Sequence, residues 1–141
     1  GPEEKYEHYL GCKVAACVVE GYRPRDELSY VLYNIPGRQV GRIALRGDRT
    51  MFLFVFRAEH DDAGVGPKEQ LRNQFGDAGW ECREILAALD GVDDLYFDVV
   101  SQIRMDHWSR GRVVLIGDAA GCISLLGGEG FPIRAGWTDA G

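Results

Sequence analysis

Residues 111–120 read Gly-Arg-Val-Val-Leu-Ile-Gly-Asp-Ala-Ala, and the interpretation of the whole chain starts from them. The run from Val113 to Ile116 is aliphatic and mostly β-branched, and Gly117-Asp118 stops it sharply, as is typical of a fully buried strand. An aspartate at the carboxyl end of a buried strand in an α/β sheet lies where such sheets bind ligands. A buried strand followed by a polar turn and a flexible loop is an equally good interpretation of these residue types alone.

A second glycine cluster, Leu126-Gly127-Gly128-Glu129-Gly130, follows this strand. Glycines let the backbone approach a ligand closely, and a helix that begins there would offer free N–H groups to an anion. Together with Trp108 and residues 111–120, the cluster resembles the second flavin-binding motif of FAD-dependent monooxygenases of the aromatic-hydroxylase type. This family includes para-hydroxybenzoate hydroxylase and the tetracycline-inactivating monooxygenases.

The resemblance implies a flavin site and a reaction. It implies that Asp118 holds the ribityl chain of FAD and that the later glycine loop lies against the pyrophosphate. It also implies NAD(P)H as co-substrate and the hydroxylation, with O2, of a small aromatic or polycyclic molecule. No catalytic residue and no metal ligand is assigned. The expected cofactor-binding residues are Gly117, Asp118, Leu126, Gly127, Gly128 and Gly130.

Four short runs of apolar and aromatic residues precede this motif, and short turns such as Pro36-Gly37 join them. Closely spaced strands with tight turns favour an antiparallel sheet. Residues 3–10 could form a short helical turn that leads into it. The strands are expected at residues 13–20, 28–34, 39–45 and 50–57.

The fourth of these runs is apolar on both faces, because phenylalanines alternate with other apolar residues. One interpretation is a sheet covered by helices on one side and by another domain on the other. A second places an aromatic face over a flavin or an aromatic substrate, and the two are compatible. The expected substrate-binding residues are Tyr30, Tyr33, Phe52, Phe54 and Phe56.

Two helices, or one broken helix, are expected at residues 67–76 and 79–90, because Pro67 suits a helix start and Gly76 weakens the middle. Residues 95–105 form a long extended run. The expected fold class is α+β, an antiparallel sheet with covering helices plus a buried strand and loop from a flavin-binding domain. The resemblance divides the chain into a substrate-binding domain, residues 1–107, and part of an FAD-binding domain, residues 108–141.

Composition excludes several classes of protein. The formal net charge of −6 argues against a nucleic-acid binder, and no apolar run is long enough to cross a membrane. The four cysteines and three histidines lack metal-ligand spacing, and free thiols fit a cytoplasmic protein. No Gly-x-Ser-x-Gly elbow supports hydrolase chemistry.

Two motifs of the family, an initial Gly-x-Gly-x-x-Gly turn and a later Asp-Gly motif, do not occur upstream of Gly111. We therefore expect a fragment that binds FAD weakly or not at all, is inactive alone, and leaves the strand at Val113–Ile116 without neighbours. The alternative is a non-catalytic sheet module that binds a substrate or a partner. In either case an exposed sheet or strand is expected to pair with a second copy.

Overall fold

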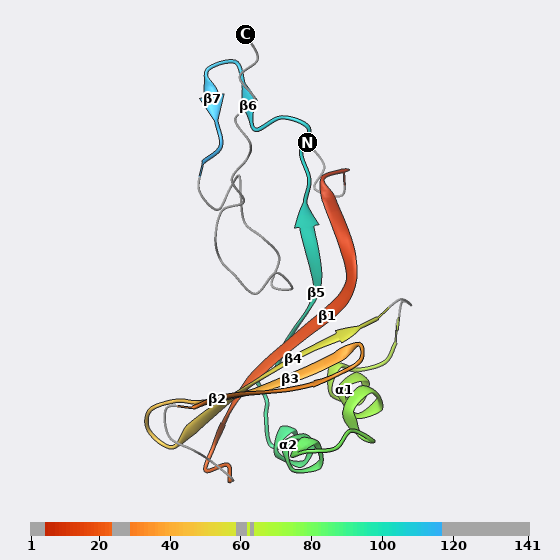
Figure 1. The fold of residues 1–141 in the computed structure, drawn as a ribbon, viewed down its shortest axis with the longest axis vertical. Coiled ribbons are helices and arrows are strands. Elements are labelled where there is room, and N and C mark those ends of the chain that lie inside the picture. The colour runs from red at the N-terminus through yellow and green to blue at the C-terminus, as the bar shows by residue number, and fades with distance from the viewer. Residues whose placement is uncertain (1–4, 24–28, 59–61, 63, 117–141) are drawn as a thin grey trace. The chain divides into compact units, whose positions relative to one another are not determined.

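The structure, a computed structural model, describes residues 5–23, 29–58, 62 and 64–116 (Figure 1). These residues form two compact units. One spans residues 11–99, and the other combines residues 5–10 with residues 100–116.

The larger unit contains most of a five-stranded sheet with the order β2-β3-β4-β1-β5. The pairs β2–β3, β3–β4 and β4–β1 are antiparallel, so the expected antiparallel sheet is confirmed. The turn between β2 and β3 contains Gly37, whose φ of 75° favours glycine. The strands are β1 (Glu7–Glu20), β2 (Tyr30–Ile35), β3 (Arg38–Ala44), β4 (Arg49–Arg57) and β5 (Tyr96–Ile103).

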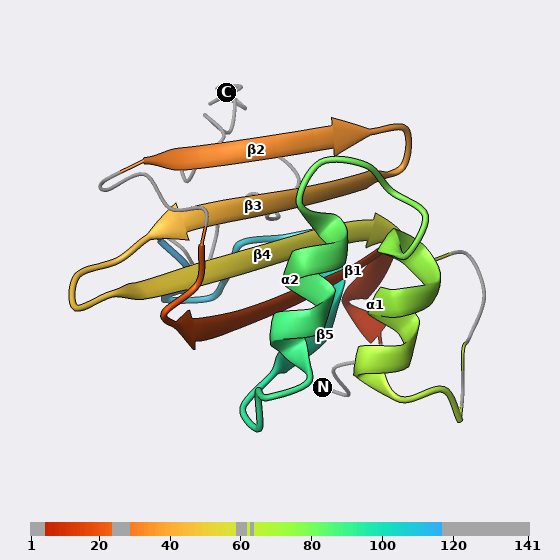
Figure 2. The ribbon, with the colours of Figure 1, turned by 90° about the horizontal axis from the view of Figure 1, so that it is seen from below.

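Two helices, α1 (Pro67–Phe75) and α2 (Cys82–Leu89), cover one face of this sheet (Figure 2). Helix α1 begins at Pro67, where the absence of a backbone N–H costs nothing because the first N–H groups of a helix have no acceptor within it. Gly76 caps the other end. Trp80, in the short connection, has a positive φ of 53°, so the chain turns sharply before α2. The expected pair of helices with a break near Gly76 is confirmed.

The core lies between β4 and the helices. Phe52, Phe54 and Phe56 are at most 1% exposed, and the Phe54 ring lies 5.4 Å from that of Phe75 in α1. Alternation along β4 directs every second side chain to the same face, so three phenylalanines reach the helices together. Helices on one face of an antiparallel sheet make an α+β fold, as expected from the sequence.

The smaller unit contains a short hairpin. Its strands β6 (Ser109–Arg110) and β7 (Val113–Val114) are antiparallel, and Gly111 has a φ of 61° in the turn between them. The backbone N–H of Leu115 donates to the carbonyl of Trp108 at 2.8 Å, which extends the hairpin.

Two expectations for this unit are wrong. Residues 7–10 are strand and not a helical turn, because the backbone here pairs with the end of β5: the Arg104 N–H donates to the Tyr6 carbonyl. The run Val113–Ile116 is exposed, by 68% at Val113 and 77% at Ile116, and is not buried. Within the described part of this unit, β7 pairs with β6 alone.

Candidate functional site

All six residues expected to bind the flavin, Gly117, Asp118, Leu126, Gly127, Gly128 and Gly130, lie outside the described residues. Their roles therefore stay predictions. The described strand β7 leads directly toward them in sequence, ending three residues before Gly117.

Strand register assigns the predicted substrate contacts to opposite faces of the sheet. Residues directly paired across antiparallel strands share a face, and Phe54 pairs with Val40, which pairs with Tyr33. Tyr33, Phe52, Phe54 and Phe56 thus point toward the helices, and the Tyr33 ring stacks on that of Trp80 at 5.6 Å. A ligand could reach the three phenylalanines only by displacing a helix, so their placement does not favour a role in substrate binding.

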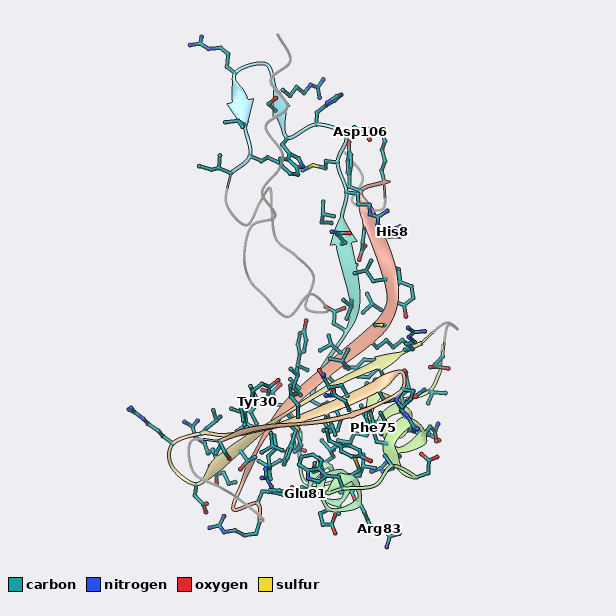
Figure 3. The ribbon with its side chains drawn as sticks, in the orientation of Figure 1. His8, Tyr30, Phe75, Glu81, Arg83 and Asp106 are labelled. Atoms are coloured by element: carbon teal, nitrogen blue, oxygen red, sulfur yellow. The ribbon has the colours of Figure 1, made fainter. Side chains whose placement is uncertain are left out.

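The opposite face, which we call the open face, is covered by no helix or strand of the unit formed by residues 11–99. Tyr30 is 54% exposed there, and Figure 3 shows it on the side of the sheet away from Phe75 and Glu81. A Cβ on Gly41 would lie 3.1 Å from the Tyr30 ring and 3.2 Å from Leu32, so glycine lets both side chains lie against β3. The open face also carries Val18, Met51, Leu53 and Val55.

A polar cluster that sequence reasoning missed joins the sheet to α2. The Arg42 guanidinium of β3 lies 2.5 Å from the Glu81 carboxylate, and the Tyr22 hydroxyl donates to the same carboxylate at 3.0 Å. Arg42 also lies 5.6 Å from the centre of the Trp80 ring. Burial, followed by the hydrogen bond to Glu81, raises the pKa of the Tyr22 hydroxyl, so it stays a proton donor. No sequence signal connects Arg42 with Glu81, because only the folded sheet brings them together.

A second buried cation, Lys13 of β1, ties the start of α1 to the sheet. Its ammonium donates to Gln70 Oε1 at 3.0 Å and lies 3.6 Å from the Asp62 carboxylate. The Gln70 amide in turn donates to the Val65 carbonyl at 2.8 Å. A buried ammonium needs such partners, so these contacts satisfy a charge that the core would otherwise exclude. Their role is structural.

A groove of about 870 Å³ runs along the second half of β1, beside the loop that follows α2. Its apolar lining includes Val18, Met51 and Val92, and its rim carries Glu20, Asp93 and Asp94. Cys17 also lines it, but burial raises the pKa of this thiol to about 11, so it is not a nucleophile near neutral pH.

Two kinds of feature are absent from the part of the chain that the structure describes. It contains no group of three or more histidine, cysteine or acidic side chains that could hold a metal ion. None of its helices has the length and apolar character needed to span a bilayer. The described cysteines, Cys12, Cys17 and Cys82, are all free thiols.

Several proteins similar to this chain carry the name of a flavin-dependent monooxygenase, although no protein-family profile matches it. A flavin-dependent monooxygenase from an unknown prokaryotic organism is 33% identical over 125 residues, covering 86% of this chain. An FAD-dependent monooxygenase of Sarocladium schorii, asL6, is 40% identical over 79 residues, which is 53% of this chain and 19% of that protein. The crystal structure of the tetracycline destructase Tet(51) matches 84% of this chain with a TM-score of 0.63 and 28% identity.

The chain spans only part of these longer proteins: 32% of the prokaryotic monooxygenase, 33% of the Tet(51) chain and 19% of asL6. Within that part, both the sequence and the fold agree. The resemblance to FAD-dependent monooxygenases, stated from the motif at residues 111–130, is therefore confirmed.

Proposed function

We propose that this chain, a homologue of flavin-dependent monooxygenases over about a third of their length, forms the substrate-binding sheet of an FAD-dependent monooxygenase. The proposed substrate is a small aromatic or polycyclic molecule. One observation carries this proposal: helices close one face of the sheet, while the open face presents Tyr30, Leu32 and Val18 at 42–54% exposure. A flat apolar molecule gains most by covering a flat apolar surface of this kind.

In this proposal the sheet binds and orients the substrate, and its apolar side chains exclude water from it. Bound FAD supplies the oxygen-activating chemistry, with NAD(P)H as electron donor. Asp118 and the glycine loop at residues 126–130 are the proposed flavin contacts. Those residues lie outside the described part of the chain, and the open face is the described part of the proposed site.

A titration with tetracycline, as a polycyclic probe, tests the open face. Tyr30→Ala is expected to weaken binding by about five- to thirtyfold, because losing a packed aromatic contact costs about 1–2 kcal/mol. Val113→Ala, which removes an exposed apolar side chain in the other unit, is the matched control and should leave the affinity unchanged. Equal affinities for the Tyr30→Ala variant and the original chain would refute the assignment of this face.

The absorbance spectrum of the purified chain tests the flavin assignment separately. We propose that the 141 residues alone bind FAD weakly and turn over no substrate, so the expected preparation is colourless. Visible flavin bands that survive gel filtration, and disappear in an Asp118→Ala variant, would show instead that this chain holds the cofactor itself.

A non-catalytic sheet module that self-associates is the second candidate. It is favoured by the position of β2 at the edge of the sheet and by its sequence, Tyr-Val-Leu-Tyr-Asn-Ile, which carries no charge to oppose pairing. Sedimentation of the original chain and of a Leu32→Lys variant tests whether the chain self-associates through β2. A dimer that the lysine abolishes would support the module, whereas a monomer at all concentrations would exclude it.

A further inference from the structure

Among the described residues, the last part of β1 lacks a strand neighbour on one side. β1 has 14 residues and β5, its neighbour on the side away from β4, has only 8. The hydrogen bond from Arg104 to Tyr6 places the end of β5 beside the start of β1. Lys13 lies 5.9 Å from the Phe97 ring, as expected if β5 begins opposite residues 13 and 14. Residues 15–20 therefore extend beyond β5.

The backbone groups on this free edge can be identified from the register. Ala58 donates to Gly11, and Gly21 donates to Asp48, so odd-numbered residues of β1 exchange hydrogen bonds with β4. The even-numbered residues, Ala16, Val18 and Glu20, must then direct their N–H and C=O groups away from β4. Within the described residues no backbone hydrogen bond from these three crosses the free edge. Each offers one donor and one acceptor.

The groove described above lies along this same edge. All five residues from Ala16 to Glu20 line it, which means that it exposes the strand edge itself as well as side chains of both faces. The facing wall is formed by Ala88, residues 91–94 and Tyr96. Three carboxylates, those of Glu20, Asp93 and Asp94, stand on its rim, against one lining cation, Arg49. The groove therefore combines an exposed strand edge with apolar lining residues and three acidic residues.

We propose that this groove binds an extended, positively charged peptide segment, which adds to β1 as a short strand. Backbone hydrogen bonds to Ala16, Val18 and Glu20 would supply affinity without regard to sequence, as in other cases of strand addition. The acidic rim selects lysine or arginine side chains, and the formal net charge of −6 favours the approach of a cation. This proposal does not depend on the monooxygenase function.

The test is a titration of the 15N-labelled chain, followed by NMR. The probe is the blocked peptide Lys-Val-Lys-Val-Lys, and Glu-Val-Glu-Val-Glu is the charge control. Two further forms of the lysine peptide are N-methylated at alternate backbone amides, one at the odd and the other at the even positions. Strand addition predicts shifts at the amides of Ala16, Val18 and Glu20 with the lysine peptide. It also predicts that one methylation pattern abolishes binding and the other does not, because only alternate amides face β1.

The double variant Asp93→Asn/Asp94→Asn should weaken binding of the lysine peptide by about two- to tenfold, because each exposed charge pair contributes modestly. Glu69→Gln/Glu84→Gln removes the same number of charges from exposed helix positions outside the groove and should leave the affinity unchanged. The proposal would be overturned if the two N-methylated forms bound equally well, or if the glutamate peptide bound as tightly as the lysine peptide. The proposal would also be overturned if the lysine peptide shifted only the amides of Tyr30 and Leu32, or if this chain formed a dimer through Val18.

Discussion

Replacing Glu81 by alanine tests whether its buried ion pair with Arg42 holds α2 against the sheet. The Arg42 side chain is 6% exposed and that of Glu81 is 16% exposed, so little water can replace the lost carboxylate. Removing one partner of a buried pair costs about 3–5 kcal/mol. The further contacts of Arg42, including the Trp80 ring, offset part of this cost. We therefore expect the free energy of unfolding to fall by about 2–4 kcal/mol.

Urea denaturation measures this change. With a dependence of about 2 kcal/mol per molar urea, the midpoint should fall by about 1–2 M while the slope stays the same. Glu84→Ala is the matched control, since Glu84 is an exposed acid on the same helix and should change the free energy by less than about 0.5 kcal/mol.

A double-mutant cycle separates the pair from its surroundings. If the two charges stabilise each other, Arg42→Ala/Glu81→Ala should cost less than the sum of the single variants by about 1 kcal/mol or more. Equal costs for Glu81→Ala and Glu84→Ala, or single-variant costs that simply add, would exclude this stabilising role of the ion pair.

Two further predictions concern the core. Phe54→Ala should lower the free energy of unfolding by about 3–5 kcal/mol in the same urea assay, because the ring is 1% exposed and packs on Phe75; a loss under 1 kcal/mol would contradict this packing. Burial raises the pKa of the Cys17 thiol from 9.0 to about 11. Between pH 9 and 11 the folded state therefore keeps a proton that the unfolded state loses, and the free energy of unfolding should fall as the pH rises through this range. A Cys17→Ala variant should lack that part of the alkaline loss, and an unchanged pH profile would exclude the thiol as its source.

Local sequence determined the strands and helices well. Alternation from residue 50 to 57, the Pro36-Gly37 turn and the stop at Gly76 each act over a few residues, and β4, the β2–β3 turn and α1 follow them closely. The motif at residues 111–130 was sufficient to recognise the monooxygenase relatives. Residues 7–10 were misassigned because a charged and aromatic stretch has no periodicity of its own, and pairing with β5 makes it strand.

Only the tertiary structure decided which surfaces are covered and which are exposed. Alternation shows that β4 has two apolar faces but not which one the helices cover, since that depends on where α1 and α2 return to the sheet. The ion pair of Arg42 with Glu81 joins two groups that are far apart in sequence. The groove at Val18 likewise brings β1 together with residues 91–94, which are far from it in sequence. Short-range conformational preferences are encoded residue by residue, whereas burial and strand neighbours depend on the packing of the whole sheet, which no local pattern contains.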